Sequence, residues 1–159
     1  MGVVYTLAIS GFDNLKKGRA KPTLLSLKSY LSQIEHKNEV KLLCLDACES
    51  CLVFADGEYK KELSKNFEGF LDKDVKVYHF NVNTGLQVIK ESVFFNSEGV
   101  SEEICFSLTL DKKGVSDQVI VEYKDKVYDF TNYLGITKKY ASTSELIEEK
   151  QRVINEVLN

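Results

Sequence analysis

The feature that most constrains the fold is a series of short apolar segments separated by polar turns. Short, β-branched runs of this kind predict strands, and they occur at 3–9, 40–45, 75–80, 104–110, 118–123 and 127–130. Apolar residues recur instead at helical spacing in 22–36, 59–70 and 143–158. Segment 84–96 fits a helix and a strand equally well, so the pattern leaves it open.

The order of these segments predicts a fold class. In the first half strands and helices alternate, which is typical of a βαβ-like unit. In the second half the strands are close together in sequence and favour antiparallel hairpins. Ser142 and Glu145 have the spacing of a capping box before the last apolar stripe. We therefore expect an α/β or α+β fold, with residues 1–159 forming one domain, a mixed sheet and a C-terminal amphipathic helix.

Composition excludes several classes of function. The chain has 159 residues, of which 43% are hydrophobic, and a net charge of −3. A dedicated nucleic-acid-binding protein is usually basic, so nucleic acid is an unlikely partner. No apolar run reaches the ~18 residues of a membrane helix, and we expect no membrane association. Four cysteines are too few for a small secreted scaffold. This predicts a cytoplasmic, reducing location.

Three of the cysteines lie close together, with the spacing Cys44-x3-Cys48-x2-Cys51. Cys44 lies within an apolar run, and we expect it to be buried and without a ligand, since free cysteine is among the most buried residues. Cys48 and Cys51 have the spacing of a zinc or redox pair. A structural zinc site needs four ligands, and no second pair is present. Structural thiols are the preferred interpretation, and a metal or redox role for Cys48 and Cys51 is the alternative.

A basic loop, residues 11–21, follows the first predicted strand and leads into the first predicted helix. Its cations are Lys16, Lys17, Arg19 and Lys21. A helix N-terminus flanked by cations can hold a phosphate group. However, the glycine spacing matches no known phosphate-binding motif. A solvated surface loop is therefore the simpler interpretation, and a phosphate site is the alternative.

Two aspartates follow the first two predicted strands. If these strands are parallel neighbours, Asp13 and Asp46 lie at the same edge of the sheet, where ligands of open α/β folds bind. Two carboxylates at this edge could hold Mg²⁺. This arrangement would suit a small phosphoryl-transfer, nuclease or nucleotide-binding protein. Aspartates are also common in turns after strands, which gives the alternative interpretation.

The C-terminal helix is the strongest candidate for an interaction element. Leu146, Val153, Ile154 and Val157 lie on its apolar stripe, and Lys150 falls near the middle. We expect Val153, Ile154 and Val157 to be deeply packed and the Lys150 ammonium to reach solvent at the rim. The pattern does not decide whether the helix packs on its own sheet or on another subunit.

The preferred function is therefore a non-catalytic protein–protein interaction or assembly subunit, such as a small viral, phage or bacterial-machine component. This is preferred over an enzyme because the sequence contains no complete catalytic set. No cofactor is expected, and the partner would be another protein or a second copy of the chain. The alternative is the Mg²⁺-dependent or nucleotide-binding protein that uses Asp13, Asp46 and the basic loop.

Overall fold

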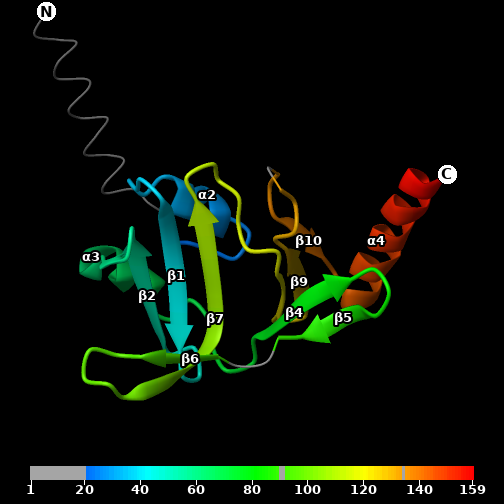
Figure 1. Ribbon diagram of the computed structural model, residues 1–159. Coiled ribbons are helices and arrows are strands. Elements are labelled where there is room, and N and C mark those ends of the chain that lie inside the picture. The colour runs from blue at the N-terminus through cyan, green and yellow to red at the C-terminus, as the bar shows by residue number, and fades with distance from the viewer. Residues whose placement is uncertain (1–20, 90–91, 134) are drawn as a thin grey trace, which may run out of the picture.

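Two antiparallel sheets of five strands make up most of the protein (Figure 1). The computed structural model describes residues 21–89, 92–133 and 135–159. Sheet A has the strand order β3-β2-β1-β7-β6, and sheet B has the order β10-β9-β8-β4-β5. All the strand pairs are antiparallel. The predicted mixed sheet with a βαβ-like half is therefore wrong.

Sheet A contains the apolar strands on either side of the central β1. Its members are β1 (Glu39–Leu45), β2 (Ser50–Ala55), β3 (Glu58–Tyr59), β6 (Ser92–Phe95) and β7 (Ser101–Asp111). The predicted strands 40–45 and 104–110 correspond to β1 and β7. The predicted strand 3–9 lies outside the described residues.

Sheet B is built from short strands of the central and C-terminal parts of the chain. Its members are β4 (Lys76–Asn81), β5 (Gly85–Val88), β8 (Ile120–Tyr123), β9 (Lys126–Asp129) and β10 (Lys138–Tyr140). The predicted antiparallel second half is confirmed by the β8–β9 pairing. Segment 84–96, for which the sequence did not decide between helix and strand, contributes β5 to sheet B and β6 to sheet A.

The β1–β2 hairpin explains why the βαβ prediction failed. Asp46 and Cys48 adopt left-handed backbone conformations, with φ of 54° and 61°, and reverse the chain directly after β1. β2 then returns beside β1, with Val40 opposite Ala55 and Leu45 opposite Ser50. A tight turn allows only an antiparallel return, because parallel neighbours need a long crossover.

Short helices cover one face of sheet A. They are α2 (Leu27–Ser32), α3 (Lys61–Ser64) and the 3₁₀ turn η1 (Lys65–Phe67), all shorter than the helices predicted for 22–36 and 59–70. Leu27, Leu31 and Phe67 join the same buried cluster as Val40 and Leu42 of β1. These helices and the strands therefore share one apolar core.

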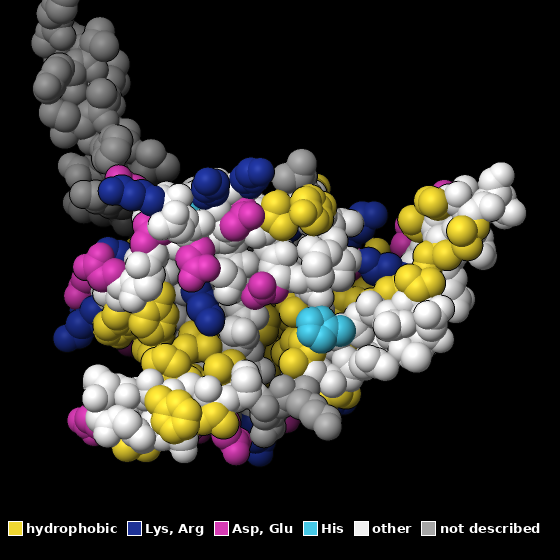
Figure 2. All heavy atoms as spheres, in the orientation of Figure 1, with side chains coloured by type: hydrophobic (Ala, Val, Ile, Leu, Met, Phe, Trp, Pro, Cys, Tyr) yellow, Lys and Arg dark blue, Asp and Glu magenta, His cyan; other side chains and the backbone are white. Residues whose placement is uncertain are grey.

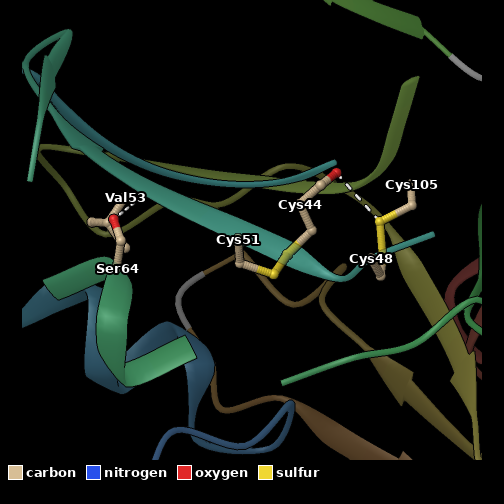
Figure 3. Close-up of a disulfide and its surroundings, with 6 residues drawn as sticks. All are labelled: Cys44, Cys48, Cys51, Val53, Ser64 and Cys105. Atoms are coloured by element: carbon tan, nitrogen blue, oxygen red, sulfur yellow. Dashed lines mark hydrogen bonds between the residues drawn. A yellow bond between two sulfur atoms is a disulfide. The ribbon is translucent and has the colours of Figure 1, made fainter. Parts of the chain in front are cut away.

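A buried hydroxyl group connects α3 to sheet A. The Ser64 hydroxyl accepts a hydrogen bond from the Val53 backbone N–H at 2.9 Å and donates to the Lys60 carbonyl at 2.9 Å (Figure 3). Both polar groups of the buried side chain are thus satisfied, as burial requires.

The last helix, α4 (Thr143–Leu158), confirms the predicted C-terminal helix. Its N-cap is Ser142, whose side chain accepts the Glu145 N–H, and the Glu145 carboxylate accepts the Ala141 N–H. This is a variant of the expected capping box. Figure 1 shows that α4 starts beside sheet B and then extends away from both sheets.

Candidate functional site

All four cysteines form disulfides (Figure 3). Cys44 and Cys51 face each other across the β1–β2 hairpin, with their Cα atoms 4.0 Å apart. Cys48, in the turn, bonds to Cys105 of β7. The expectation of structural thiols is therefore wrong, and so is the alternative of a Cys48–Cys51 metal or redox pair, because these two residues have different partners. Cys44 is fully buried, as predicted.

The disulfides also correct the predicted location. Disulfides form and persist in oxidising compartments and are rare in the cytosol. The pairing therefore indicates an extracellular or periplasmic type of environment instead of a reducing cytoplasm.

The Cys48–Cys105 disulfide also contacts the backbone of β1. Cys105 Sγ lies 3.3 Å from the Cys44 carbonyl oxygen, but a disulfide sulfur has no hydrogen to donate, so this is a packing contact.

A cavity of about 650 Å³ lies between the two sheets. Its apolar lining includes Val77 of β4, Phe106 of β7 and Val119, which precedes β8. The volume is within the range of ligand pockets in proteins, about 300–1,000 Å³. The cavity is therefore the place where a small polar ligand could be held.

The charged groups of this cavity come from both sheets and from the segment between β7 and β8. Asp46 and Glu103 line it from the side of sheet A, Lys73 and Lys76 line it from the side of sheet B, and Asp117 lines it from the connecting segment. His79 adds a polar group, and its Nδ1 lies 3.1 Å from the Gln118 carbonyl oxygen. Because a carbonyl only accepts, Nδ1 is the donor of this hydrogen bond. The arrangement can bind polar groups of either charge.

The predicted acidic site is only partly visible. Asp13 lies outside the described residues, so its distance from Asp46 is not defined. Asp46 is exposed in the β1–β2 turn, and its backbone N–H donates to the Glu103 carbonyl at 2.7 Å. Within residues 21–89, 92–133 and 135–159, no three His, Cys, Asp or Glu side chains are grouped to hold a metal. The position of Asp46 is therefore explained by its role in the turn.

The basic loop also falls largely outside the described part of the chain. Lys16, Lys17 and Arg19 are not described, and Lys21 is the one member that is. Lys21 is exposed to solvent. The phosphate-site interpretation of this loop stays a prediction.

The apolar stripe of α4 is only half used by the protein's own fold. Leu146 is fully buried with Ile120 and Val127 of sheet B. Val153 is 43% exposed and Val157 is 79% exposed, so the expectation that these residues are deeply packed is wrong. Ile154 is intermediate. The physical reason is that α4 packs on sheet B through Leu146 and Lys150 of its first half, and Figure 2 shows the rest of the helix standing away from the other described residues.

A buried charge cluster, which sequence reasoning missed, holds the first half of α4 on sheet B. Asp129 of β9 is almost fully buried, and its carboxylate lies 2.8 Å from Lys150 Nζ. The same carboxylate accepts hydrogen bonds from the N–H and hydroxyl of Thr131. Lys150 also donates to the Thr131 hydroxyl. The Lys150 side chain is 21% exposed, so it does lie near the rim, but its ammonium is held by an ion pair that anchors the helix.

Lys28 of α2 forms a second polar anchor near Asp129. Its Nζ donates to the carbonyl oxygens of Asn132 and Gly135, at 2.9 and 3.3 Å. Burial lowers the pKa of Lys28, and the negative charge of Asp129 opposes this shift. The only sequence signal for these anchors was a lysine within an apolar stripe, which shows that a lysine needs a partner but not which one.

The described chain contains no helix that is both long and apolar enough to cross a membrane. No family model matches the chain, and the searches of curated proteins and of solved structures found no significant match either.

Proposed function

We propose that this chain is a non-catalytic assembly subunit of an oxidising compartment, which inserts the second half of α4 into an apolar groove of a partner protein. We define the second half of α4 as residues 151–158. The supporting observation is that the apolar stripe continues in this half, past the residues through which α4 contacts sheet B. Val153, Val157 and Leu158 are 43%, 79% and 78% exposed.

The spacing of these residues suits a helix-in-groove complex. Val153 and Val157 are four residues apart, as are Ile154 and Leu158, so the four form one continuous stripe. Proteins that bind a helix in a groove contact apolar anchor residues at such spacings. The helix is also prepared for binding, because its base is fixed by Leu146 and by the Lys150–Asp129 ion pair.

The charges of this half argue for a protein groove and against an anionic lipid surface. Its one cation, Arg152, lies 2.8 Å from Glu149 and 2.5 Å from Glu156. Amphipathic helices that bind anionic membranes carry an excess of Lys and Arg on the polar face. The ion-paired polar face of α4 has more carboxylates than cations and lacks that excess.

The size of the stripe argues against simple self-pairing of α4. Residues 151–158 form about two helical turns, and a stable protein interface needs about 800 Å² from each partner. Two short helices side by side supply less than this area and would give at most a weak, concentration-dependent pairing. A groove that surrounds the helix removes more of the stripe from water, and is therefore the better fit.

The alternative function depends on residues outside the described chain. A Mg²⁺-dependent or nucleotide-binding protein would need Asp13 and the basic loop beside Asp46. Asp46 does line the inter-sheet cavity. The described residues provide no further observation that favours this alternative over the assembly subunit.

Site-specific photo-crosslinking in the native host tests the proposal. A benzophenone amino acid replaces Val157 on the stripe in one variant and the exposed Glu148, on the opposite face of α4, in a matched control. We expect a discrete adduct with one other protein from position 157 and none from position 148. Equal labelling at both positions, or an adduct only with lipid, with a second copy or with the chain's own N-terminal residues, contradicts the proposal.

The crosslinked protein must then bind in purified form. We expect Val153→Gln/Val157→Gln to weaken its binding on the order of tenfold or more, as the loss of buried anchors does. Glu148→Gln, on the opposite face of α4, is the matched control and leaves the affinity unchanged. If both variants bind like the unmodified protein, the stripe is not the binding surface.

A further inference from the structure

One of the two outer strands of sheet A, β6, has a free edge among the described residues. β6 (Ser92–Phe95) pairs with β7 on one side, and the described residues place no strand on its other side. Its sequence, Ser-Val-Phe-Phe, contains no charge and no proline. Edge strands are normally protected by charges, prolines or bulges because their free backbone groups can pair with another chain. β6 has no charge or proline and pairs with β7 in a regular register, so its protection is limited to its short length of four residues.

The direction of its free backbone groups follows from the turn to β7. The Asn96 N–H donates to the Val100 carbonyl at 3.0 Å, so the Asn96 backbone faces β7. Successive residues of a strand alternate in direction, so Phe94 and Ser92 also face β7. The N–H and C=O groups of Val93 and Phe95 therefore point outward, away from sheet A.

The side chains at the same two positions are exposed and apolar. Val93 is 51% exposed and Phe95 is 67% exposed, and they lie on one face of the strand. Phe94 points to the other face, where its ring lies 6.4 Å from that of Phe54. Figure 2 shows apolar side chains gathered on the β6–β7 hairpin. Val93 and Phe95 thus have both outward-facing backbone groups and exposed apolar side chains.

We propose that β6 pairs antiparallel with β6 of a second copy of this chain, about a two-fold axis at Phe94. In this register Val93 faces Phe95 of the second copy, and Phe95 faces Val93. Both of these are outward-pointing positions, so each pair exchanges both of its backbone hydrogen bonds. Two five-stranded sheets become one continuous sheet across the interface.

The side chains favour a second copy over an unrelated strand. A two-fold interface must be self-complementary, and this register provides that complementarity. It places an aromatic ring beside a β-branched side chain twice, a stabilising cross-strand pair. It also keeps Phe94 of both copies on the same face of the merged sheet. Because the paired segment is short, the interface is below the standard size and the dimer depends on concentration.

Sedimentation velocity over a series of rising protein concentrations tests the pairing. We expect the unmodified chain to shift from monomer to dimer. Val93→Lys/Phe95→Lys places like charges opposite each other and abolishes the shift. Val93→Lys/Phe95→Glu places opposite charges face to face and restores it. Val100→Lys is the matched control, because Val100 is also exposed but lies beyond the paired residues. A chain that stays monomeric throughout, or a double-lysine variant that dimerises like the unmodified chain, overturns the proposal.

Hydrogen exchange on the unmodified chain tests the same proposal without a variant. The amides of Val93 and Phe95 should exchange more slowly as the concentration rises. The amide of Phe94, which faces β7, serves as the internal reference and should not change. If the Val93 and Phe95 amides are already protected at the lowest concentration, or remain equally exposed while a dimer forms, the edge of β6 is not the interface.

Discussion

Removing the disulfides one at a time should destabilise the protein unequally. The chain-entropy relation makes the contribution of a disulfide grow with the length of the loop that it closes. Cys48–Cys105 has a sequence separation of 57, which gives about 4 kcal/mol. Cys44–Cys51 has a separation of 7, which gives about 2.4 kcal/mol. Losses of this size lower Tm by about 8–16 °C and about 5–10 °C in a chain of this length.

The assay is thermal and urea unfolding of two double variants, Cys48→Ala/Cys105→Ala and Cys44→Ala/Cys51→Ala. Each pair is the size-matched control for the other, because both remove two sulfur atoms. We expect the long-loop variant to be the less stable. Equal losses, or a larger loss from the short loop, would refute the loop-entropy reasoning. Thiol titration of the denatured, unreduced protein should find no free thiols, and four free thiols would refute the pairing itself.

Three further predictions concern charged and phenolic groups. Asp129→Asn removes the buried partner of Lys150 and should cost about 3–5 kcal/mol in urea unfolding; a loss of a few tenths would show that the pair is not an anchor. Hydrogen bonds from backbone N–H groups lower the pKa of Asp56 below its ordinary value of 3.8. The ionised Asp56 carboxylate therefore stabilises the folded protein fully above pH 3.8, and this contribution is lost as the pH falls through the folded pKa. Asp56→Asn should therefore flatten the acid limb of the stability–pH curve below about pH 4, and an unchanged limb would contradict this. Burial and the hydrogen bond to Glu122 raise the pKa of Tyr78 to about 12. The protonated Tyr78 therefore stabilises the folded protein fully below pH 10, and this contribution is lost as the pH rises towards 12. The difference between the ultraviolet titration curves of the unmodified chain and Tyr78→Phe should show one phenol that ionises near pH 12, and an ionisation near pH 10 would contradict this.

Local patterns predicted many elements of the fold but not their connection. The strand at 40–45 and the helix at 143–158 were visible from spacing and capping residues, and both are present. The hairpin after β1 was missed because residues 50–55 follow it after only a short turn and were not recognised as a strand. Without β2 the sequence resembled a strand followed by a helix, which is why a parallel crossover was expected.

The candidate sites were harder to predict because they depend on register and long-range contacts. Cys44 and Cys51 are opposite each other only once the β1–β2 register is known, and Cys105 reaches Cys48 across 57 positions of sequence. The residues of the apolar stripe on α4 were predicted correctly, but the burial of Val153 and Val157 was not. Spacing shows that residues share a face of a helix, and it does not show how far a sheet extends beneath that face.

The second half of α4 lies outside the core that the described residues form, and we propose that it binds a partner. The most direct measurement is the free energy of unfolding of Val153→Gln/Val157→Gln, compared with Leu146→Ala on the same helix. We predict that the double glutamine variant is as stable as the unmodified chain, within about 0.5 kcal/mol as for surface positions, whereas Leu146→Ala loses about 2–5 kcal/mol. A loss of several kcal/mol from the glutamine variant would show that the stripe belongs to the protein's own core, and would contradict the claim.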